Sequence, residues 1–144
     1  MEIVIINGPN LNLLGRREPE IYGKLSFTDY LKDLIAAFPE VKFTYLQSNH
    51  EGSIIDFLQD YGFKNNGIIL NPAAYTHTSI AIADAIRSID AAVVEVHLTI
   101  PESRESYRKL NFIRPFCVNS VEGKGLEGYA IAVEFLIKLL SERK

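Results

Sequence analysis

Short apolar runs and helical patterns of apolar residues alternate along this chain. Five runs are predicted to be strands. Four of them are short and mostly apolar, as expected of strands packed inside a sheet, and residues 41–47 alternate with period two and are rich in residues that favour strands. These predicted strands cover residues 3–6, 41–47, 67–70, 91–96 and 116–119. In the segments between them, apolar residues recur at helical spacing, which indicates amphipathic helices. The predicted helices cover residues 26–38, 51–61, 78–89 and 127–141, with a short polar helical piece at 102–109.

Capping and breaking residues mark the ends of these helices. Ser26 has the small hydroxyl side chain that is typical of an N-cap. Pro39 ends the first helix, and Gly62 ends the second. The third helix is capped by either Thr76 or Thr78. These signals bound each helix between two predicted strands.

The order of the elements indicates an α/β fold. Strands that alternate with helices pack as a parallel, doubly wound sheet with helices on both faces. We predict a flavodoxin-like five-stranded sheet with strand order 2-1-3-4-5. The chain of 144 residues contains no repeat, linker or low-complexity segment, so we expect residues 1–144 to form a single domain.

Composition narrows the classes of function. The chain is 47% hydrophobic and 23% charged, which provides enough apolar material for a core and too little charge for disorder. The net charge is −3 and no basic run occurs, so nucleic-acid binding is not expected, although local arginines suffice for a small anion. Cys117 is the single cysteine, so no internal disulfide can form. The first residues lack the basic segment of a signal peptide, and no apolar run approaches the roughly 20 residues of a membrane span, so we expect a soluble, cytoplasmic protein without a membrane partner.

A long connection, residues 7–23, follows the first predicted strand. Strand-to-helix connections usually take about 2–6 residues, and a loop of this length that begins with Gly8 and Pro9 is typical of a binding loop, so we expect a lid. In a parallel sheet, ligands bind outside the carboxyl ends of the strands. Polar side chains gather at those ends, namely residues 7–10, Asn71, His77, Glu95 and His97. We therefore expect the functional site at this edge.

The same edge excludes several functions that related folds support. A phospho-acceptor regulator needs an aspartate after the third strand and acidic residues after the first, where this chain has Asn71 and Asn7. A flavodoxin needs a Ser/Thr/Gly-rich phosphate loop after the first strand, which Pro9 and the leucines beside it do not provide. We expect neither a dinucleotide-binding site nor a P-loop, which would need a GxxxxGK[ST] motif, and the acidic residues do not cluster as metal ligands. We expect a site without a cofactor and without a metal.

Several sequence blocks together resemble one family. They cover residues 7–15, 17–19, 22–23, 47–52, 71–79, 95–97 and 128–129. In this order, and over essentially the whole chain, they are similar to type II 3-dehydroquinate dehydratases. The resemblance implies a lyase that dehydrates 3-dehydroquinate to 3-dehydroshikimate by anti elimination through an enolate, in the shikimate pathway of aromatic amino acid biosynthesis or its catabolic counterpart. It also implies that no metal or Schiff-base lysine takes part, and that the chain forms a homododecamer, a tetramer of trimers.

The resemblance assigns catalytic roles as well. Tyr22 would take the proton from the carbon next to the ketone. A phenol of ordinary pKa, about 10, is almost wholly protonated at neutral pH, so Arg17 would supply a cation that stabilises its anion. His97 would protonate the departing hydroxyl, and Glu95, two residues earlier on the same strand face, would orient the imidazole. Asn10 would lie near the base.

A second set of residues would bind substrate. The resemblance implies that Asn71 positions a water near the enolate and that the backbone amides of Leu98 and Thr99 hold the carboxylate. The remaining contacts fall to His77 and Arg108 at the ring hydroxyls, and to Asp84 across a trimer interface. Arg16 is interpreted as a surface charge and His50 as structural.

The chain departs from the family pattern in two places. Relatives often have Ser-Asn after the Glu-Val-His-Leu run, where this chain has Thr99, Ile100 and Pro101. Thr99 keeps a hydroxyl and an amide, so we expect carboxylate binding to survive while Pro101 reshapes the turn. Residues 112–120 also look less typical. The alternative function is a small-acid-binding protein that kept the fold and lost activity, and the presence of the tyrosine, arginine and histidine named above favours the enzyme.

Overall fold

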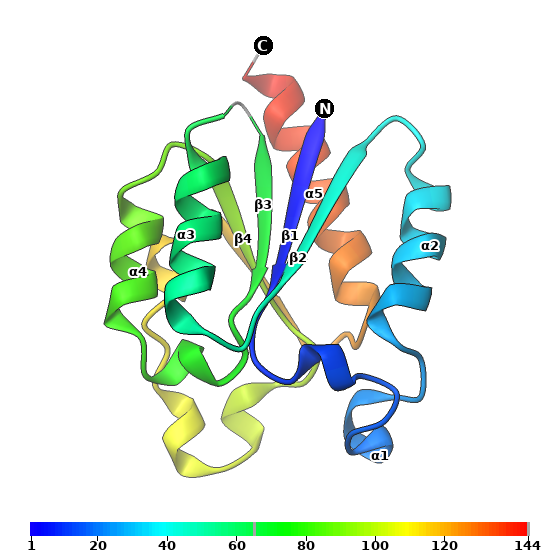
Figure 1. Ribbon diagram of the computed structural model, residues 1–144, viewed down its shortest axis with the longest axis vertical. Coiled ribbons are helices and arrows are strands. Elements are labelled where there is room, and N and C mark those ends of the chain that lie inside the picture. Colours follow the sequence, from blue (N-terminus) through cyan, green and yellow to red (C-terminus); the bar gives the residue numbers. More distant parts are fainter. Residues whose placement is uncertain (65, 144) are drawn as a thin grey trace.

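The computed structural model of this protein describes residues 1–64 and 66–143. Within these residues, five parallel strands form one sheet in the order β2-β1-β3-β4-β5, which confirms the predicted order (Figure 1). The strands are β1 (Glu2–Asn7), β2 (Lys42–Gln47), β3 (Gly67–Asn71), β4 (Ala92–His97) and β5 (Asn119–Glu122). The registers align Asn7 with Asn71 and His97 with Glu122, so the carboxyl ends meet at one edge.

Helices cover both faces of the sheet. Figure 1 shows α3 (Glu51–Gly62) and α4 (Ile80–Arg87) over one face, and α2 (Phe27–Ala37) and α5 (Glu127–Glu142) over the other. Successive residues of a strand point to opposite faces. Ile3 and Ile5 accordingly pack in the core under α2 and α5, while Val4 and Ile6 pack in the core under α3 and α4. Burial on both faces explains why β1, β3 and β4 are mostly apolar, whereas the edge strands β2 and β5 are less buried and contain more polar residues.

The fifth strand was predicted three residues too early. The structure forms a 3₁₀ turn at Arg114–Phe116, in which Pro115 occupies an early position. Pro115 fixes its φ angle at a value that suits such a turn. The chain therefore reaches the sheet later, and its first bond to β4 runs from the Val118 N–H to the Val93 carbonyl at 2.9 Å.

Two helix predictions also need correction. Ser79 caps α4, because its hydroxyl accepts the N–H of Ile82 at 2.9 Å, so the assignment to Thr76 or Thr78 was wrong. Those residues belong to, or directly follow, a 3₁₀ turn at Ala73–His77 that delays the helix. The polar piece predicted at 102–109 is two 3₁₀ turns, Pro101–Ser103 and Ser106–Lys109, separated by extended backbone at Glu105. The cap at Ser26 is confirmed, since its hydroxyl accepts the Asp29 N–H at 3.1 Å.

Two connections extend beyond the carboxyl edge. Residues 8–26 contain a 3₁₀ turn at Leu11–Leu13 and the short helix α1 (Pro19–Tyr22), and the segment after β4 contains the two turns just described. Figure 1 shows both below the sheet, at the end away from the N- and C-termini. Within the described residues, no helix combines the length and apolar character needed to cross a membrane.

Candidate active site

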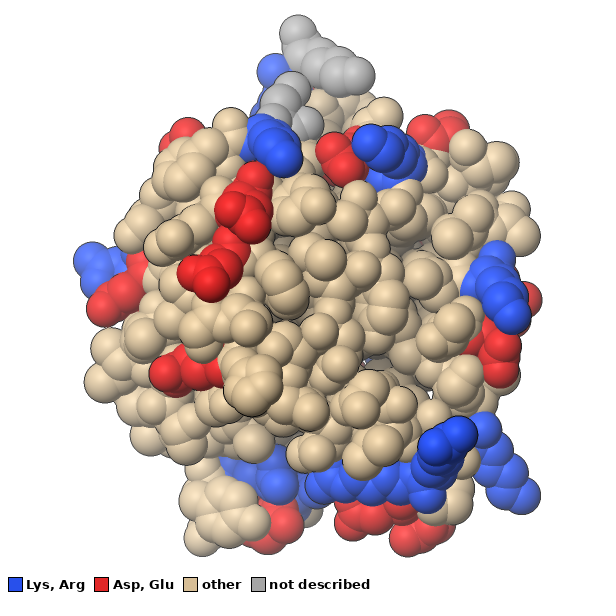
Figure 2. All heavy atoms as spheres, in the orientation of Figure 1, with Lys and Arg blue, Asp and Glu red and all other residues tan. Residues whose placement is uncertain are grey.

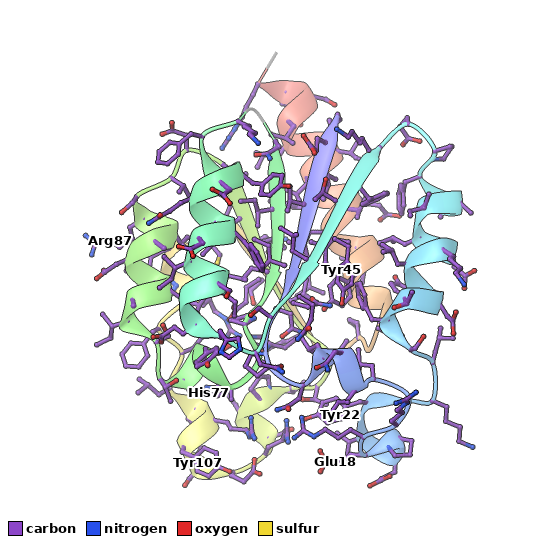
Figure 3. The ribbon with its side chains drawn as sticks, viewed as in Figure 1. Glu18, Tyr22, Tyr45, His77, Arg87 and Tyr107 are labelled. Atoms are coloured by element: carbon purple, nitrogen blue, oxygen red, sulfur yellow. The ribbon has the colours of Figure 1, made fainter. Side chains whose placement is uncertain are left out.

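A cavity opens at the carboxyl edge, between the two connections. Nine of the residues that sequence reasoning assigned to the site line it, together with seven that it did not assign. The assigned residues at the cavity are Asn10, Arg17, Tyr22, Asn71, His77, His97, Leu98, Thr99 and Arg108. Figure 3 shows Tyr22 and His77 at this edge, contributed by opposite sides of the molecule. Lys and Arg side chains gather along the same edge, beside acidic ones (Figure 2).

Tyr22 is held at the cavity by the geometry of α1. Glu18 enters the helix with a left-handed backbone (φ 41°), and Pro19 occupies the first helical turn, where its missing N–H costs nothing. Gly23 ends the helix at φ 87°, a conformation that favours glycine, and its N–H bonds to the Pro19 carbonyl at 2.9 Å. The helix is thus a single turn with the tyrosine as its last residue.

Two guanidinium groups approach the Tyr22 ring. The Cζ atoms of Arg17 and Arg104 each lie 5.6 Å from the ring centroid. Arg17 was expected here, but Arg104 was not assigned from the sequence. Arg104 comes from the connection after β4, between its two 3₁₀ turns, so the two cations reach the ring from different segments. Cations within about 6 Å of an aromatic ring are attracted to it.

His97 and Glu95 form the second polar pair of the site. They share one face of β4, as their spacing predicted, and His97 Nε2 lies 2.7 Å from Glu95 Oε1. Because a carboxylate accepts, Nε2 is the protonated nitrogen of this contact, which leaves Nδ1 available to a substrate. Glu95 is fully buried and lies behind the histidine, outside the cavity lining.

Glu95 remains ionised despite its burial. Burial by itself raises the pKa of a carboxyl group, but hydrogen bonds and charge from His97, with further bonds from Asn111 and Ser120, bring the pKa of Glu95 down to about 2. Asn111 Nδ2 donates to Oε1 at 2.7 Å, and the Ser120 hydroxyl donates to Oε2 at 2.8 Å. Arg114 Nε adds a bond to Oε2 at 3.2 Å. Glu95 is therefore a carboxylate anion at neutral pH, bonded to the His97 imidazole.

Asn71 is fixed by a buried network. The Tyr129 hydroxyl, on a side chain with no exposed surface, donates to Asn7 Oδ1 at 2.7 Å and accepts from Asn71 Nδ2 at 3.2 Å. Burial raises the pKa of the Tyr129 phenol, so it keeps its proton. Asn71 Oδ1 accepts the Ala73 N–H at 3.2 Å. Beside it, Gly8 lies so close to the chain that a Cβ there would be 2.7 Å from the carbonyl oxygen of Pro72, so only glycine fits.

The cavity wall opposite Tyr22 includes His77 and Arg108. His77 Nδ1 lies 2.6 Å from the Leu110 carbonyl, which can only accept, so Nδ1 carries the proton. Burial lowers the pKa of His77, which favours the neutral ring with Nε2 as an acceptor. Arg108 Nε donates to Glu105 Oε2 at 2.6 Å, and this bond fixes the orientation of the guanidinium. Both side chains therefore have defined orientations.

Residues 99–101, which depart from the family pattern, still form part of the cavity wall. Thr99 and Pro101 both line the cavity, and Pro101 begins the 3₁₀ turn. The carbonyls of Leu98 and Thr99 accept from the N–H groups of Gly125 and Gly123 at 2.9 and 3.0 Å. These bonds tie the segment to the start of α5.

Other assigned residues lie differently. Asn10 has a left-handed backbone (φ 67°), and its N–H donates to Asn49 Oδ1 at 3.0 Å. Asp84 does not line the cavity. It lies on the exposed surface of α4, where it pairs with Arg87 at 3.5 Å. His50 precedes α3 at the N-cap position, but its side chain makes no capping bond.

Comparisons with known proteins identify the family. The sequence model of dehydroquinase class II matches residues 1–137. The chain belongs to the dehydroquinase class II family. It is 49% identical to a 3-dehydroquinate dehydratase of Exiguobacterium sp. over 139 residues, which cover 96% of this chain and 95% of that protein. It is 47% identical to a 3-dehydroquinate dehydratase of Fusobacterium nucleatum, covering 96% and 97%.

A solved structure agrees with this assignment. The type II dehydroquinase of Butyrivibrio crossotus superposes with a TM-score of 0.88 at 42% identity, covering 94% of this chain and 97% of that chain. The family that the sequence resembles and its flavodoxin-like fold are thereby confirmed.

Sequence reasoning about this dehydroquinase class II chain did not assign the residues of the polar turns and of β5 that contact Tyr22 or Glu95. Arg104, Asn111 and Arg114 lie in segments without helical or strand periodicity, and Ser120 lies in the strand that was placed too early. The one available signal was compositional, since arginines and an asparagine follow β4 on the side of the sheet where ligands bind. Among the described residues, no group of three or more His, Cys, Asp and Glu side chains is arranged to hold a metal ion.

A glycine motif was also overlooked. Residues 123–128 read GKGLEG, the GxGxxG spacing of dinucleotide-binding loops, and they lie between β5 and α5. In such loops, free backbone N–H groups meet a pyrophosphate. Here the N–H of Gly123 bonds to the carbonyls of His97 and Thr99, and that of Gly125 bonds to the carbonyl of Leu98. The motif in this dehydroquinase class II chain therefore closes the loop after β4 and does not present its amides to a ligand.

Proposed function

We propose that this chain dehydrates 3-dehydroquinate to 3-dehydroshikimate, a hydro-lyase reaction of the shikimate pathway in aromatic amino acid biosynthesis. The proposal is supported by family membership and by relatives that are named 3-dehydroquinate dehydratase. One structural observation carries it. A tyrosine ring with two guanidiniums at 5.6 Å lies at the same cavity as a histidine whose far nitrogen is bound to a buried carboxylate.

Tyr22 is the proposed base. Loss of a proton from the carbon next to the ketone produces an enolate, and the phenol oxygen takes that proton when it starts as the anion. Arg17 and Arg104 favour the anion because each places a positive charge close to the ring. Asn71 is the proposed anchor for a water at the developing enolate, since the bonds to Tyr129 and Ala73 fix its amide.

His97 is the proposed general acid. The hydroxyl on the carbon beyond the enolate leaves as water when it receives a proton, and the electron pair of the enolate completes the new double bond. His97 Nδ1 would supply this proton, because Nε2 is bound to Glu95. The anionic Glu95 stabilises the imidazolium form that donates. Anti elimination requires Tyr22 and His97 on opposite faces of the substrate.

The remaining cavity residues are the proposed substrate contacts. His77 Nε2 is an acceptor for a ring hydroxyl, and Arg108 donates to a second one. Leu98 and Thr99 offer backbone amides for the carboxylate, and Asn10 lies beside the base. The long connection after β1, residues 7–23, would act as a lid.

Assembly and location complete the proposal. We infer that the chain is a single domain, as the sequence predicts, and that it assembles as a cytoplasmic homododecamer, a tetramer of trimers, in which Asp84 reaches the cavity of a neighbouring subunit. The position of Asp84 on an exposed face of α4, outside its own cavity, supports this role, as does the exposed Ile80 on the same helix. A free, half-buried Cys117 suits a reducing compartment. Sedimentation velocity of the purified protein measures the assembly directly.

An absorbance assay tests the reaction. The product contains a conjugated enone, so absorbance in the mid-ultraviolet should rise when 3-dehydroquinate is added. Among the described residues that line the cavity there is no lysine, so borohydride together with substrate should leave the activity intact. Folded protein at high concentration that produces no rise would defeat the proposal, and inactivation by borohydride would point to an imine instead of an enolate.

A further inference from the structure

Strands β4 and β5 place four polar side chains side by side. The register pairs Glu95 with Ser120 and His97 with Glu122, and paired residues of parallel strands point to the same face. The Ser120 hydroxyl donates to Glu95 Oε2 at 2.8 Å, so the two strands are joined by a side-chain bond as well as by the backbone. Glu122 brings a second carboxylate next to the proposed acid.

The segment before β5 holds Glu95 from both sides. Asn111 Oδ1 accepts the backbone N–H groups of Ile113 and Arg114, both at 2.9 Å, and its Nδ2 donates to Glu95 Oε1 at 2.7 Å. Arg114 Nε donates to Glu95 Oε2 at 3.2 Å. Ile113 has no exposed surface and anchors the segment in the core. Every oxygen of Glu95 therefore has two donors, which leaves its carboxylate one orientation.

Arg114 joins the two carboxylates. While its Nε bonds to Glu95, its Nη2 bonds to Glu122 Oε2 at 2.6 Å. A guanidinium that bonds to both carboxylates offsets much of their combined charge near the imidazole. The Arg114 side chain is 37% exposed and that of Glu122 is 29% exposed, whereas that of Glu95 is completely buried. Water therefore reaches Arg114 and Glu122 but not Glu95.

We propose that Arg114 and Glu122 are a positioning pair for the acid of this site, in which Arg114 orients Glu95 against His97 and the pair sets the charge around the imidazole. This inference rests on the proposed function, in which His97 donates a proton to the departing hydroxyl. Neither residue lines the cavity, so the pair acts on substrate only through Glu95 and His97.

Other charged and titratable groups lie around the same cavity or beside Glu95, and a test must leave them unchanged. His77 interacts with the charge of His97, Arg17, Tyr22, Arg104 and Arg108 line the same cavity, and Cys117 interacts with Glu95. Substitutions at residues 114 and 122 leave all of these in place. The exposed ion pair between Lys32 and Asp29 on α2, at 3.2 Å, provides a matched control, because neither residue lines the cavity.

Imidazole NMR on the free protein measures the charge effect directly, because the chain contains only three histidines. Arg114→Met removes the cation, and we expect the pH at which half of the His97 rings are protonated to rise by about one pH unit. Glu122→Gln removes a carboxylate, and we expect a fall of similar size. The double variant should return near the wild-type midpoint, and Lys32→Met should leave it unchanged.

Kinetics with 3-dehydroquinate measure the positioning effect. We expect Arg114→Met to lower kcat about tenfold with little change in KM, and Arg114→Lys to recover part of the loss. Midpoints that stay constant, or that move in the same direction in both single variants, would overturn the inference. An inactive wild-type enzyme would defeat the proposed function alone, since the NMR midpoints do not depend on turnover. If Arg114→Met does not fold, the nearly isosteric Glu122→Gln still decides the sign.

Discussion

Glu95 should make the stability of this protein depend on pH in a specific window. Its carboxyl has an ordinary pKa of 4.5 in an unfolded chain and a pKa of about 2 in the folded chain. A folded pKa that is lowered contributes stability that is fully present above pH 4.5 and is lost as the pH falls towards 2. Each pH unit of difference corresponds to about 1.4 kcal/mol, so the whole contribution is about 3 kcal/mol.

Replacement of this carboxylate by an amide isolates the contribution. In Glu95→Gln, the free energy of unfolding should be about 3 kcal/mol lower than in the wild type at pH 5, and this difference should shrink by about 1.4 kcal/mol per pH unit as the pH falls further. Urea unfolding monitored by far-ultraviolet circular dichroism, at one protein concentration and a series of pH values, gives the difference directly. The other acidic groups contribute equally to both proteins and cancel.

Glu134→Gln provides the control, because Glu134 is exposed on α5 and undergoes the same chemical change. Its unfolding free energy should differ from that of the wild type by less than about 0.5 kcal/mol throughout. A constant difference between Glu95→Gln and the wild type from pH 5 to pH 2 would refute the reasoning, since it would mean that the buried carboxylate titrates alike in both states.

Three further outcomes follow from the geometry. Tyr22→Phe should lower kcat by about 10²- to 10⁴-fold while calorimetry shows substrate binding within a few-fold of normal, and near-normal turnover would refute its assignment as the base. Arg104→Met should move the rising limb of the pH–rate profile upward by about one pH unit, because one of the two cations that favour the phenolate is lost, and an unmoved limb would exclude that role. Tyr129→Phe leaves Asn7 without a donor and Asn71 without an acceptor in a buried place, so urea unfolding should show a loss of about 2–4 kcal/mol, and kcat should fall with it. A loss below about 0.5 kcal/mol would show that these bonds are not needed.

The sequence by itself determined the architecture of this protein. Apolar runs and helical spacing show which residues are buried. Strands that are buried on both faces are typical of a parallel sheet covered by helices on both sides. The same reasoning predicted the edge at which the cavity opens, because strand ends are visible in the sequence and parallel strands end together. It also placed Glu95 and His97 on one face of β4, since a spacing of two residues has that consequence in any strand.

Only the tertiary structure decided which side chains meet across the chain. Tyr129 and Asn7 are separated by 122 positions and form one hydrogen bond, and the sequence carries no local signal of such a pair. Arg104 and Arg114 lie in or beside short 3₁₀ turns, where no periodicity reveals which way a side chain points. The cap of α4 depends on where the preceding turn stops, so Ser79 could not be distinguished from its neighbouring threonines. Local pattern thus sets the elements, while the contacts of the site depend on how polar connections pack against strands that are distant in sequence.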